Sequence, residues 1–190
     1  MSKTYSTMLP LGSKAPSFSL PDIHGQKCSL DSFPESKAYL VMFICNHCPY
    51  VVHIREAMVT LAEEFQKQGV GVVAINSNDA KEYTEDSPEK MKEYAKKYHY
   101  SFPYLCDESQ NVAKAFKAAC TPDFFLFNEE KRLVYRGQFD DSRPSNKVEP
   151  EGSDLRRALT DLLAKRKVSD DQKPSMGCNI KWKAGNEPHY

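Results

Sequence analysis

The chain has 190 residues, with 26 Lys plus Arg balanced by 26 Asp plus Glu, so its formal net charge is zero. Hydrophobic residues make up 40% and charged residues 27%, a composition typical of a soluble globular domain and too apolar for wholesale disorder. The charge balance argues against a nucleic-acid binder that relies on excess positive charge, and no apolar run approaches the roughly 18–20 residues of a membrane span. The first ten residues lack the apolar core of a secretory signal, so we expect a cytoplasmic location.

The first half of the chain has the pattern of a βαβ unit. Residues 10–37, punctuated by prolines, are expected to form an irregular N-terminal extension with short extended pieces. The apolar run over 38–44 predicts a strand buried on both faces, and 70–76 predicts a second one. Between them, apolar residues at helical spacing predict a helix over 51–68, with Pro49 in its first turn. Short joints between these elements predict that the two strands are parallel.

The second half alternates helices with extended segments. In chain order we expect a polar loop over 77–87, a charged helix over 88–98, a short extended piece over 102–105, a short helix over 109–118, a hairpin of strands 123–127 and 132–135, and an amphipathic helix over 153–165.

This order of elements predicts an α/β domain over residues 1–167, in which a mixed central sheet carries helices on both faces. Residues 168–190 then form a C-terminal tail. Because exposed apolar side chains tend to be covered, we expect the tail to dock on the domain, near Cys45, with Trp182 largely buried.

Cys45 and Cys48 are the only two of the six cysteines that are close in sequence. A strand that runs directly into Cys-x-x-Cys, followed by a helix, places both sulfurs at the helix N-terminus, where unpaired N–H groups and the macrodipole favour a thiolate. We expect Cys45 to be the more exposed, with a lowered pKa, and to attack, while Cys48 resolves. An imidazolium at His47 would stabilise the thiolate.

Three other roles for the cysteines remain open. A non-enzyme alternative is a copper- or zinc-binding module that uses Cys45, Cys48 and one histidine. Zinc commonly takes two Cys-x-x-Cys halves, however, and the sequence has one, so we predict no metal site. Cys120, two residues before Pro122, and Cys178, in the tail, are possible additional redox residues.

Three parts of the chain resemble the thioredoxin-like superfamily, and within it the redoxin branch of AhpC/TSA-type and TlpA-like proteins. They are the segment from Leu11 to Gly25, the strand–Cys-x-x-Cys–helix, and Thr121-Pro122 before the first hairpin strand. The resemblance covers about residues 10–165. It implies a thioredoxin-like fold, a cis peptide bond before Pro122, which would face the cysteine pair as part of the catalytic site, and a substrate-binding surface that includes Thr121 and Ile44. Ile44 stands where thioredoxins have Trp.

These observations predict a thiol–disulfide oxidoreductase that reacts with protein or small-molecule disulfides, needs no cofactor, and is reduced by a small thiol or another redoxin. A peroxiredoxin-like thiol peroxidase with an antioxidant role, in which peroxide oxidises Cys45 to a sulfenic acid, is the alternative enzyme. The peroxiredoxin spacing Pro-x-x-x-Thr-x-x-Cys fits neither Cys45 nor Cys48.

Overall fold

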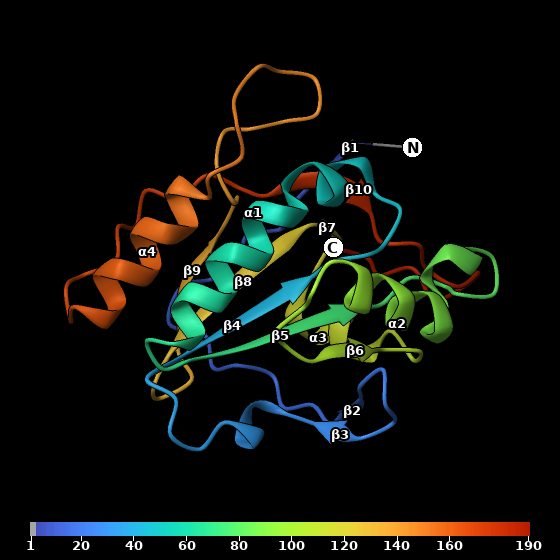
Figure 1. The fold of residues 1–190 in the computed structure, drawn as a ribbon, viewed down its shortest axis with the longest axis horizontal. Coiled ribbons are helices and arrows are strands. Elements are labelled where there is room, and N and C mark those ends of the chain that lie inside the picture. Colours follow the sequence, from blue (N-terminus) through green and yellow to red (C-terminus); the bar gives the residue numbers. More distant parts are fainter. Residues whose placement is uncertain (1–2) are drawn as a thin grey trace.

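A five-stranded mixed sheet forms the centre of the computed structural model, which describes residues 3–190 (Figure 1). Strand β4 (38–43) is parallel to β5 (70–76), and β5 is parallel to β6 (104–106), whereas β8 (123–128) is antiparallel to both β4 and β9 (133–137). The predicted parallel pair and the predicted hairpin are therefore confirmed. The order across the sheet is β6 (Tyr104–Cys106), β5 (Val70–Asn76), β4 (Ala38–Phe43), β8 (Asp123–Asn128) and β9 (Leu133–Gly137).

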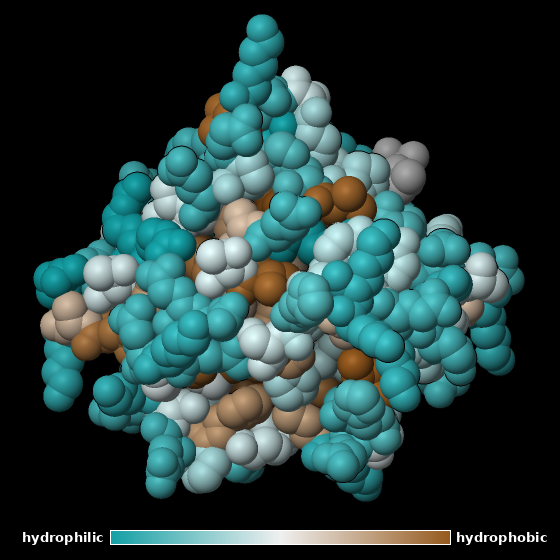
Figure 2. Space-filling model, viewed as in Figure 1, coloured by the Kyte–Doolittle hydropathy of each residue, from teal (hydrophilic) through white to brown (hydrophobic). Residues whose placement is uncertain are grey.

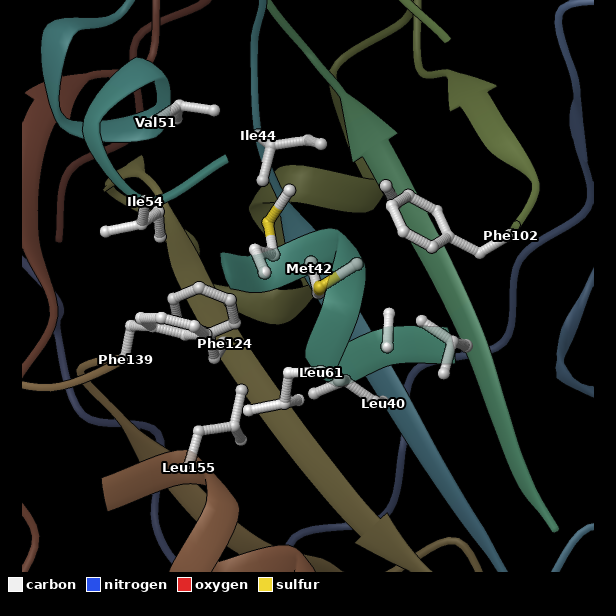
Figure 3. Packing of buried hydrophobic residues seen from close by; sticks show 14 of the residues in the cluster. Leu40, Met42, Ile44, Val51, Ile54, Leu61, Phe102, Phe124, Phe139 and Leu155 are labelled. Atoms are coloured by element: carbon white, nitrogen blue, oxygen red, sulfur yellow. The ribbon is translucent and has the colours of Figure 1, made fainter. Parts of the chain in front are cut away.

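Helices cover both faces of this sheet, as predicted for the α/β class. Alternate side chains of β4 point to opposite faces because a strand has a period of two. Leu40 and Met42 pack with one apolar cluster, which includes residues of α1 (Pro49–Gln66), α2 (Pro88–Lys97) and α4 (Ser153–Leu163). Val41 and Phe43 pack with the other, which includes α3 (Asn111–Phe116). Figure 3 shows α1 side chains such as Leu61 directed toward Leu40 of the sheet.

Several short strands lie outside the central sheet, and those of the N-terminal extension are the short extended pieces expected there. The N-terminal extension contains a two-stranded ribbon of β2 (Leu20–Pro21) and β3 (Lys27–Cys28), and η1 (Leu30–Ser32) follows it. A three-stranded sheet joins β1 (Lys3–Tyr5), β10 (Met176–Asn179) and β7 (Cys120–Thr121), with β10 in the middle and antiparallel to both neighbours. The loop predicted over 77–87 includes the 3-10 helix η2 (Thr84–Asp86).

The C-terminal tail packs on the domain through β10, which lies beside the start of α1 in Figure 1. Trp182, which we expected to be largely buried, is only partly buried. The reason is that Ile180, 1% exposed, occupies the core position on the α3 side of the sheet, which leaves the Trp182 ring at the margin of that cluster.

The surface in Figure 2 is mostly hydrophilic, with small apolar areas separated by charged side chains. Within residues 3–190, none of the helices combines the length and the apolar character that crossing a bilayer requires.

Phe116 is a sensitive test of the α3 side of the core. Its side chain is 0% exposed, and its ring contacts those of Phe43 and Phe125 at centroid distances of 5.4 and 5.3 Å. We expect Phe116→Ala to lower the free energy of unfolding by about 3–5 kcal/mol, because it removes buried apolar surface and leaves a cavity. Urea denaturation measures the loss. The control Val52→Ala, at a half-exposed position of α1, should change stability by less than about 1 kcal/mol, and an equal loss in both variants would contradict the assignment.

Candidate active site

The two cysteines of the Cys-x-x-Cys motif lie where β4 meets α1, as predicted. Cys48 is the N-cap residue of α1 and Pro49 occupies the first turn. The Thr121–Pro122 peptide bond is cis, as expected from the resemblance, and Thr121 contacts both sulfurs. Its Oγ1 is 3.3 Å from Cys45 Sγ, and its carbonyl oxygen is 3.1 Å from Cys48 Sγ.

Both sulfurs are buried, which corrects the expectation that Cys45 is the more exposed. Cys45 is 1% and Cys48 0% exposed. Strand β10 contributes to this burial, because its residue Cys178 pairs with Thr121 in the short sheet and its side chain hydrogen-bonds to Cys48. Ile44, expected at the substrate-binding surface, is also fully buried and belongs to the α1 side of the core (Figure 3).

The surroundings favour ionisation of Cys48 over ionisation of Cys45. Hydrogen bonds from Cys178 and Cys45, together with the N–H of Val51 in the first turn of α1, outweigh burial and hold the pKa of Cys48 well below its usual value of 9.0. The shared hydrogen bond with Cys48, followed by burial and the charge of Asp86, raises the pKa of Cys45. The lowered pKa expected for Cys45 is therefore wrong for this state, because a sulfur that donates to a neighbouring thiolate keeps its proton.

His47 is the only residue of the Cys45–Cys48 loop with a partly exposed side chain, at 21%. Its Nδ1 lies 2.8 Å from Asp86 Oδ2, and its ring stacks on Tyr83 with an interplanar angle of 5°. The contact with Asp86 raises the pKa of His47 against the opposing effect of burial. The imidazolium that the sequence suggested thus has a fixed partner.

Asp86 is a functional residue that the sequence analysis missed, since it treated residues 77–87 as a solvated loop. The carboxylate is 2% exposed. Burial alone would raise its pKa, but hydrogen bonds from His47, Asn78 and the Asn46 backbone lower it overall. The Asn46 N–H donates to Oδ1 at 2.7 Å, and Asn78 Nδ2 donates to Oδ2 at 2.8 Å. The carboxylate therefore anchors the loop between the two cysteines.

Asn46 completes this anchor from inside the loop, and it too was missed. Its Nδ2 donates to the Glu85 carbonyl at 2.7 Å, and its Oδ1 accepts a hydrogen bond from the Tyr104 hydroxyl at 3.2 Å. Its own carbonyl accepts from the buried guanidinium of Arg55 at 2.6 Å. No local motif reveals these contacts, which join the loop to η2, β6 and α1.

Cys120, one of the two additional redox candidates, is a buried residue two positions before the cis-proline Pro122. Its thiol donates to the Pro122 carbonyl at 3.7 Å, and burial, followed by the charge of Asp123, raises its pKa. Asp123 forms a fully buried ion pair with Arg136, at 3.5 Å, and burial raises its pKa to about 6. The structure thus brings Cys178, rather than Cys120, into contact with the cysteine pair.

One group of metal-ligating side chains occurs among residues 3–190. Donor atoms of Cys45, His47 and Asp86 all lie within 4.8 Å of one another. Sulfur, nitrogen and oxygen donors of this kind suit zinc or copper. Cys48, however, is not part of the group, three donors fall short of a closed zinc site, and His47 and Asp86 already bind each other. The alternative set that the sequence offered, with both cysteines and a histidine, differs from this group.

Comparison with known proteins identifies the family to which the chain belongs. The family model described as "AhpC/TSA family" matches residues 11–136, which is more than half of the chain. The chain belongs to the AhpC/TSA family. It is 29% identical over 124 residues to the thiol-disulfide oxidoreductase ResA of Halalkalibacterium halodurans, and the match covers 65% of this chain and 65% of that protein, just under two thirds of its length. It is 31% identical over 103 residues to peroxiredoxin Q of Oryza sativa subsp. japonica, covering 54% of this chain and 44% of that protein.

Solved structures confirm the fold. An uncharacterized conserved protein from Geobacillus kaustophilus is 51% identical, with a TM-score of 0.94 over 96% of this chain and 97% of its own. That coverage takes in most of the C-terminal tail. The thioredoxin domain of a thiol-disulfide oxidoreductase from Bacteroides vulgatus, 19% identical with a TM-score of 0.57 over 67% of this chain and 88% of its own, shares the fold alone. The domain is therefore thioredoxin-like, as predicted.

The location of the thiolate can be measured by ultraviolet absorbance during a pH titration. We expect the Cys45→Ser variant to keep a thiolate well below pH 9, because Cys178 and the Val51 N–H still donate to Cys48. The Cys48→Ser variant should lose that signal, because the acceptor is gone. Cys28→Ser, at a buried thiol outside the site, serves as the control. A low-pH thiolate that persists in Cys48→Ser and disappears in Cys45→Ser would place the charge on Cys45 instead.

The contact with Asp86 gives His47 a second measurable property. Because the folded-state pKa of His47 is raised, the stabilisation from this ion pair is fully present below the unfolded value of about 6.5 and is lost as pH rises through the folded value. Asp86→Asn should move the His47 pKa, followed by NMR, down to or below 6.5.

The exposed neighbour Glu85, whose side chain accepts a hydrogen bond from the Tyr94 hydroxyl at 3.4 Å, provides the matched control for this titration. Glu85→Gln should leave the His47 pKa close to that of the parent protein. A His47 pKa that is the same in Asp86→Asn and in the parent would show that the ion pair does not form.

Proposed function

We propose that this protein is a thiol–disulfide oxidoreductase whose Cys45–Cys48 pair cycles between dithiol and disulfide. The observation that carries the proposal is the contact of both sulfurs with Thr121, next to the cis-proline, at the N-terminus of α1. The 29% identity with a thiol-disulfide oxidoreductase over 65% of the chain supports it. None of the six cysteines, which all lie within residues 3–190, forms a disulfide. This suits a reducing compartment, and a cytoplasmic location is part of the proposal.

The attack on a substrate requires a proton shift between the two cysteines. When Cys48 is the ionised sulfur, Cys45 donates a hydrogen bond to it. Transfer of that proton along the shared hydrogen bond leaves a Cys45 thiolate, which can accept from Thr121 Oγ1 at 3.3 Å, and a Cys48 thiol, which can donate to the Thr121 carbonyl at 3.1 Å. The Thr121 hydroxyl can thus stabilise the Cys45 thiolate, and the Thr121 carbonyl can accept from the Cys48 thiol.

The reaction then follows two exchange steps. The Cys45 thiolate attacks one sulfur of the substrate disulfide, the substrate S–S bond breaks, and one substrate thiolate leaves. The leaving substrate thiolate takes up the proton held by Cys48. The resulting Cys48 thiolate then attacks Cys45 Sγ and releases the second substrate thiolate. The substrate gains two electrons, and the protein holds the Cys45–Cys48 disulfide, which a small thiol or another redoxin reduces. His47 is partly exposed, and its contact with Asp86 raises its pKa, so its protonated form can protonate the leaving thiolate.

Access limits the substrate class. Because both sulfurs are buried, a disulfide reaches Cys45 only when the covering side chains move. We propose small-molecule disulfides and flexible protein disulfides as substrates. The second candidate function is a thiol peroxidase, in which peroxide oxidises Cys45 to a sulfenic acid that Cys48 condenses with. Membership of the AhpC/TSA family and the similarity to peroxiredoxin Q favour it.

Trapping with the resolving thiol removed tests the proposal. Cys48→Ser incubated with an insulin-type disulfide should accumulate a mixed disulfide through Cys45, because the second step cannot occur, and turnover should fall by at least about a hundredfold. Mass mapping locates the bond. The matched variant Cys45→Ser should accumulate far less through Cys48, and equal trapping would reverse the roles.

The same preparations separate the two enzyme classes. Parent protein given a peroxide in place of a disulfide should turn over slowly, and Cys48→Ser should not accumulate sulfenic acid at Cys45 within the time of one disulfide exchange. If peroxide is consumed faster than the insulin-type disulfide is reduced, the peroxidase reading replaces the one proposed.

A further inference from the structure

The tail strand β10 brings a third cysteine into the proposed site. Cys178 lies opposite Thr121 in the β10–β7 register, is 4% exposed, and its side chain hydrogen-bonds to Cys48. Cys48 therefore has two sulfur neighbours, Cys45 from its own loop and Cys178 from a segment 130 residues later in the chain. A disulfide that involves Cys48 can form with either of them.

We propose that Cys178 is a third redox-active thiol, which exchanges with the Cys45–Cys48 disulfide to form a Cys48–Cys178 disulfide and set Cys45 free. This inference rests on the proposed function, because the exchange starts from the Cys45–Cys48 bond.

The structure holds Cys178 in place by a close approach of two backbones. A Cβ added to Gly177 would lie 2.0 Å from the Thr121 carbonyl oxygen and 2.7 Å from the Thr121 carbonyl carbon. Only glycine permits β10 to run this close to the residue that contacts both Cys45 and Cys48. Glycine directly before Cys178 is thus part of what brings the third sulfur to the pair.

Contacts on both sides of β10 keep it docked. Before the strand, Ser175 Oγ donates to the Gly137 carbonyl at 2.6 Å. After the strand, the Lys181 N–H donates to Asn78 Oδ1 at 2.9 Å, and the Lys181 carbonyl accepts from the Asp79 N–H at 2.8 Å. Asn78 also donates to Asp86 at 2.8 Å, so the tail and the Cys45–Cys48 loop are fastened to the same polar cluster. These contacts therefore hold Cys178 next to the Cys45–Cys48 pair.

The exchange balances without an external oxidant. The Cys178 thiolate attacks Cys48 Sγ, the Cys45–Cys48 bond breaks, the Cys48–Cys178 bond forms, and Cys45 leaves as a thiolate that takes up the proton given up by Cys178. The exchange reduces Cys45 and oxidises Cys178, while Cys48 stays in a disulfide. In the reduced protein the hydrogen bond to Cys48 raises the pKa of Cys178. When Cys48 is in a disulfide with Cys45, it no longer carries a charge. The hydrogen bond that raised the pKa of Cys178 is then lost, so Cys178 can ionise for the exchange.

The other cysteines do not share this placement. The Cys120 thiol is engaged with the Pro122 carbonyl, and the Cys28 thiol contacts the carbonyl of Ser29 at 3.8 Å, in β3 of the N-terminal extension. Cys28 is thus a suitable control for the removal of a buried thiol.

Disulfide mapping of the full chain tests the inference. The protein is equilibrated with oxidised glutathione, quenched with acid, alkylated, digested and mapped by mass. We expect both Cys45–Cys48 and Cys48–Cys178 bonds in the parent and in Cys28→Ser, the Cys48–Cys178 bond alone in Cys45→Ser, and the Cys45–Cys48 bond alone in Cys178→Ser.

A variant that keeps all six cysteines checks that the position of the strand matters. Gly177→Ala pushes β10 away from Thr121 and should reduce the Cys48–Cys178 fraction at least about tenfold while Cys45–Cys48 still forms. If Gly177→Ala does not fold, Cys178→Ser and Cys45→Ser still decide the question.

The outcomes separate this inference from the proposed function. A parent protein that forms Cys45–Cys48 only, together with a Cys45→Ser variant that carries glutathione on Cys48 and no internal bond, overturns the role of Cys178 and leaves the proposed function standing. A Cys48–Cys120 bond in place of Cys48–Cys178 also overturns it. Absence of the Cys45–Cys48 bond from every variant that retains both residues overturns the proposed function and the inference with it.

Discussion

The reactive loop depends on one buried carboxylate. Asp86 accepts hydrogen bonds from the Asn46 backbone and from the side chains of Asn76 and Asn78, and it binds His47 at 2.8 Å. A buried charge with fewer partners would be strongly destabilising, so the four contacts are what allow Asp86 to remain ionised inside the fold. In return, the carboxylate fastens the backbone of the loop between the two cysteines, and it raises the pKa of the His47 imidazole. The arrangement of the sulfurs follows from this anchor rather than from the Cys-x-x-Cys motif alone.

The buried thiolate depends on donors from separate parts of the chain. Cys45 comes from the loop, the Val51 N–H from the first turn of α1, and Cys178 from the C-terminal strand. A thiolate deprived of water needs such donors, because desolvation alone favours the thiol. A Cys-x-x-Cys pair in which the second cysteine carries the charge differs from the arrangement that the helix N-terminus predicts by itself. The difference comes from Cys178, which adds a donor on the side of Cys48 that faces the tail.

Periodicity in the sequence was sufficient for the central sheet and the main helices. The apolar runs before Cys45 and after Gly69 could be read as parallel strands because burial on both faces leaves an uninterrupted pattern. Only part of the site could be predicted from the sequence in the same way. Asp86 sits among polar residues, and nothing local distinguishes it from a solvated side chain. Its partner Asn46 lies 40 residues away, and Cys178 lies 130 residues after Cys48, in a four-residue strand that pairs with a two-residue strand. Such short strands have no periodicity to detect.

The position of the tail links the stability of its docking to the chemistry of the pair. Strand β10 contributes a donor to the Cys48 thiolate, and its following residues bind Asn78, which also binds Asp86. Undocking the strand therefore removes a hydrogen bond from the thiolate, frees a partner of the carboxylate that holds His47, and exposes the sulfurs to solvent at the same time. All three changes act on the protonation of the same two cysteines. Exposure of the reduced pair to solvent therefore also changes the pKa values of Cys45 and Cys48. In the reaction proposed above, a substrate that displaced the tail would meet sulfurs solvated by water rather than by Cys178, and the proton shared between Cys45 and Cys48 would be redistributed on access.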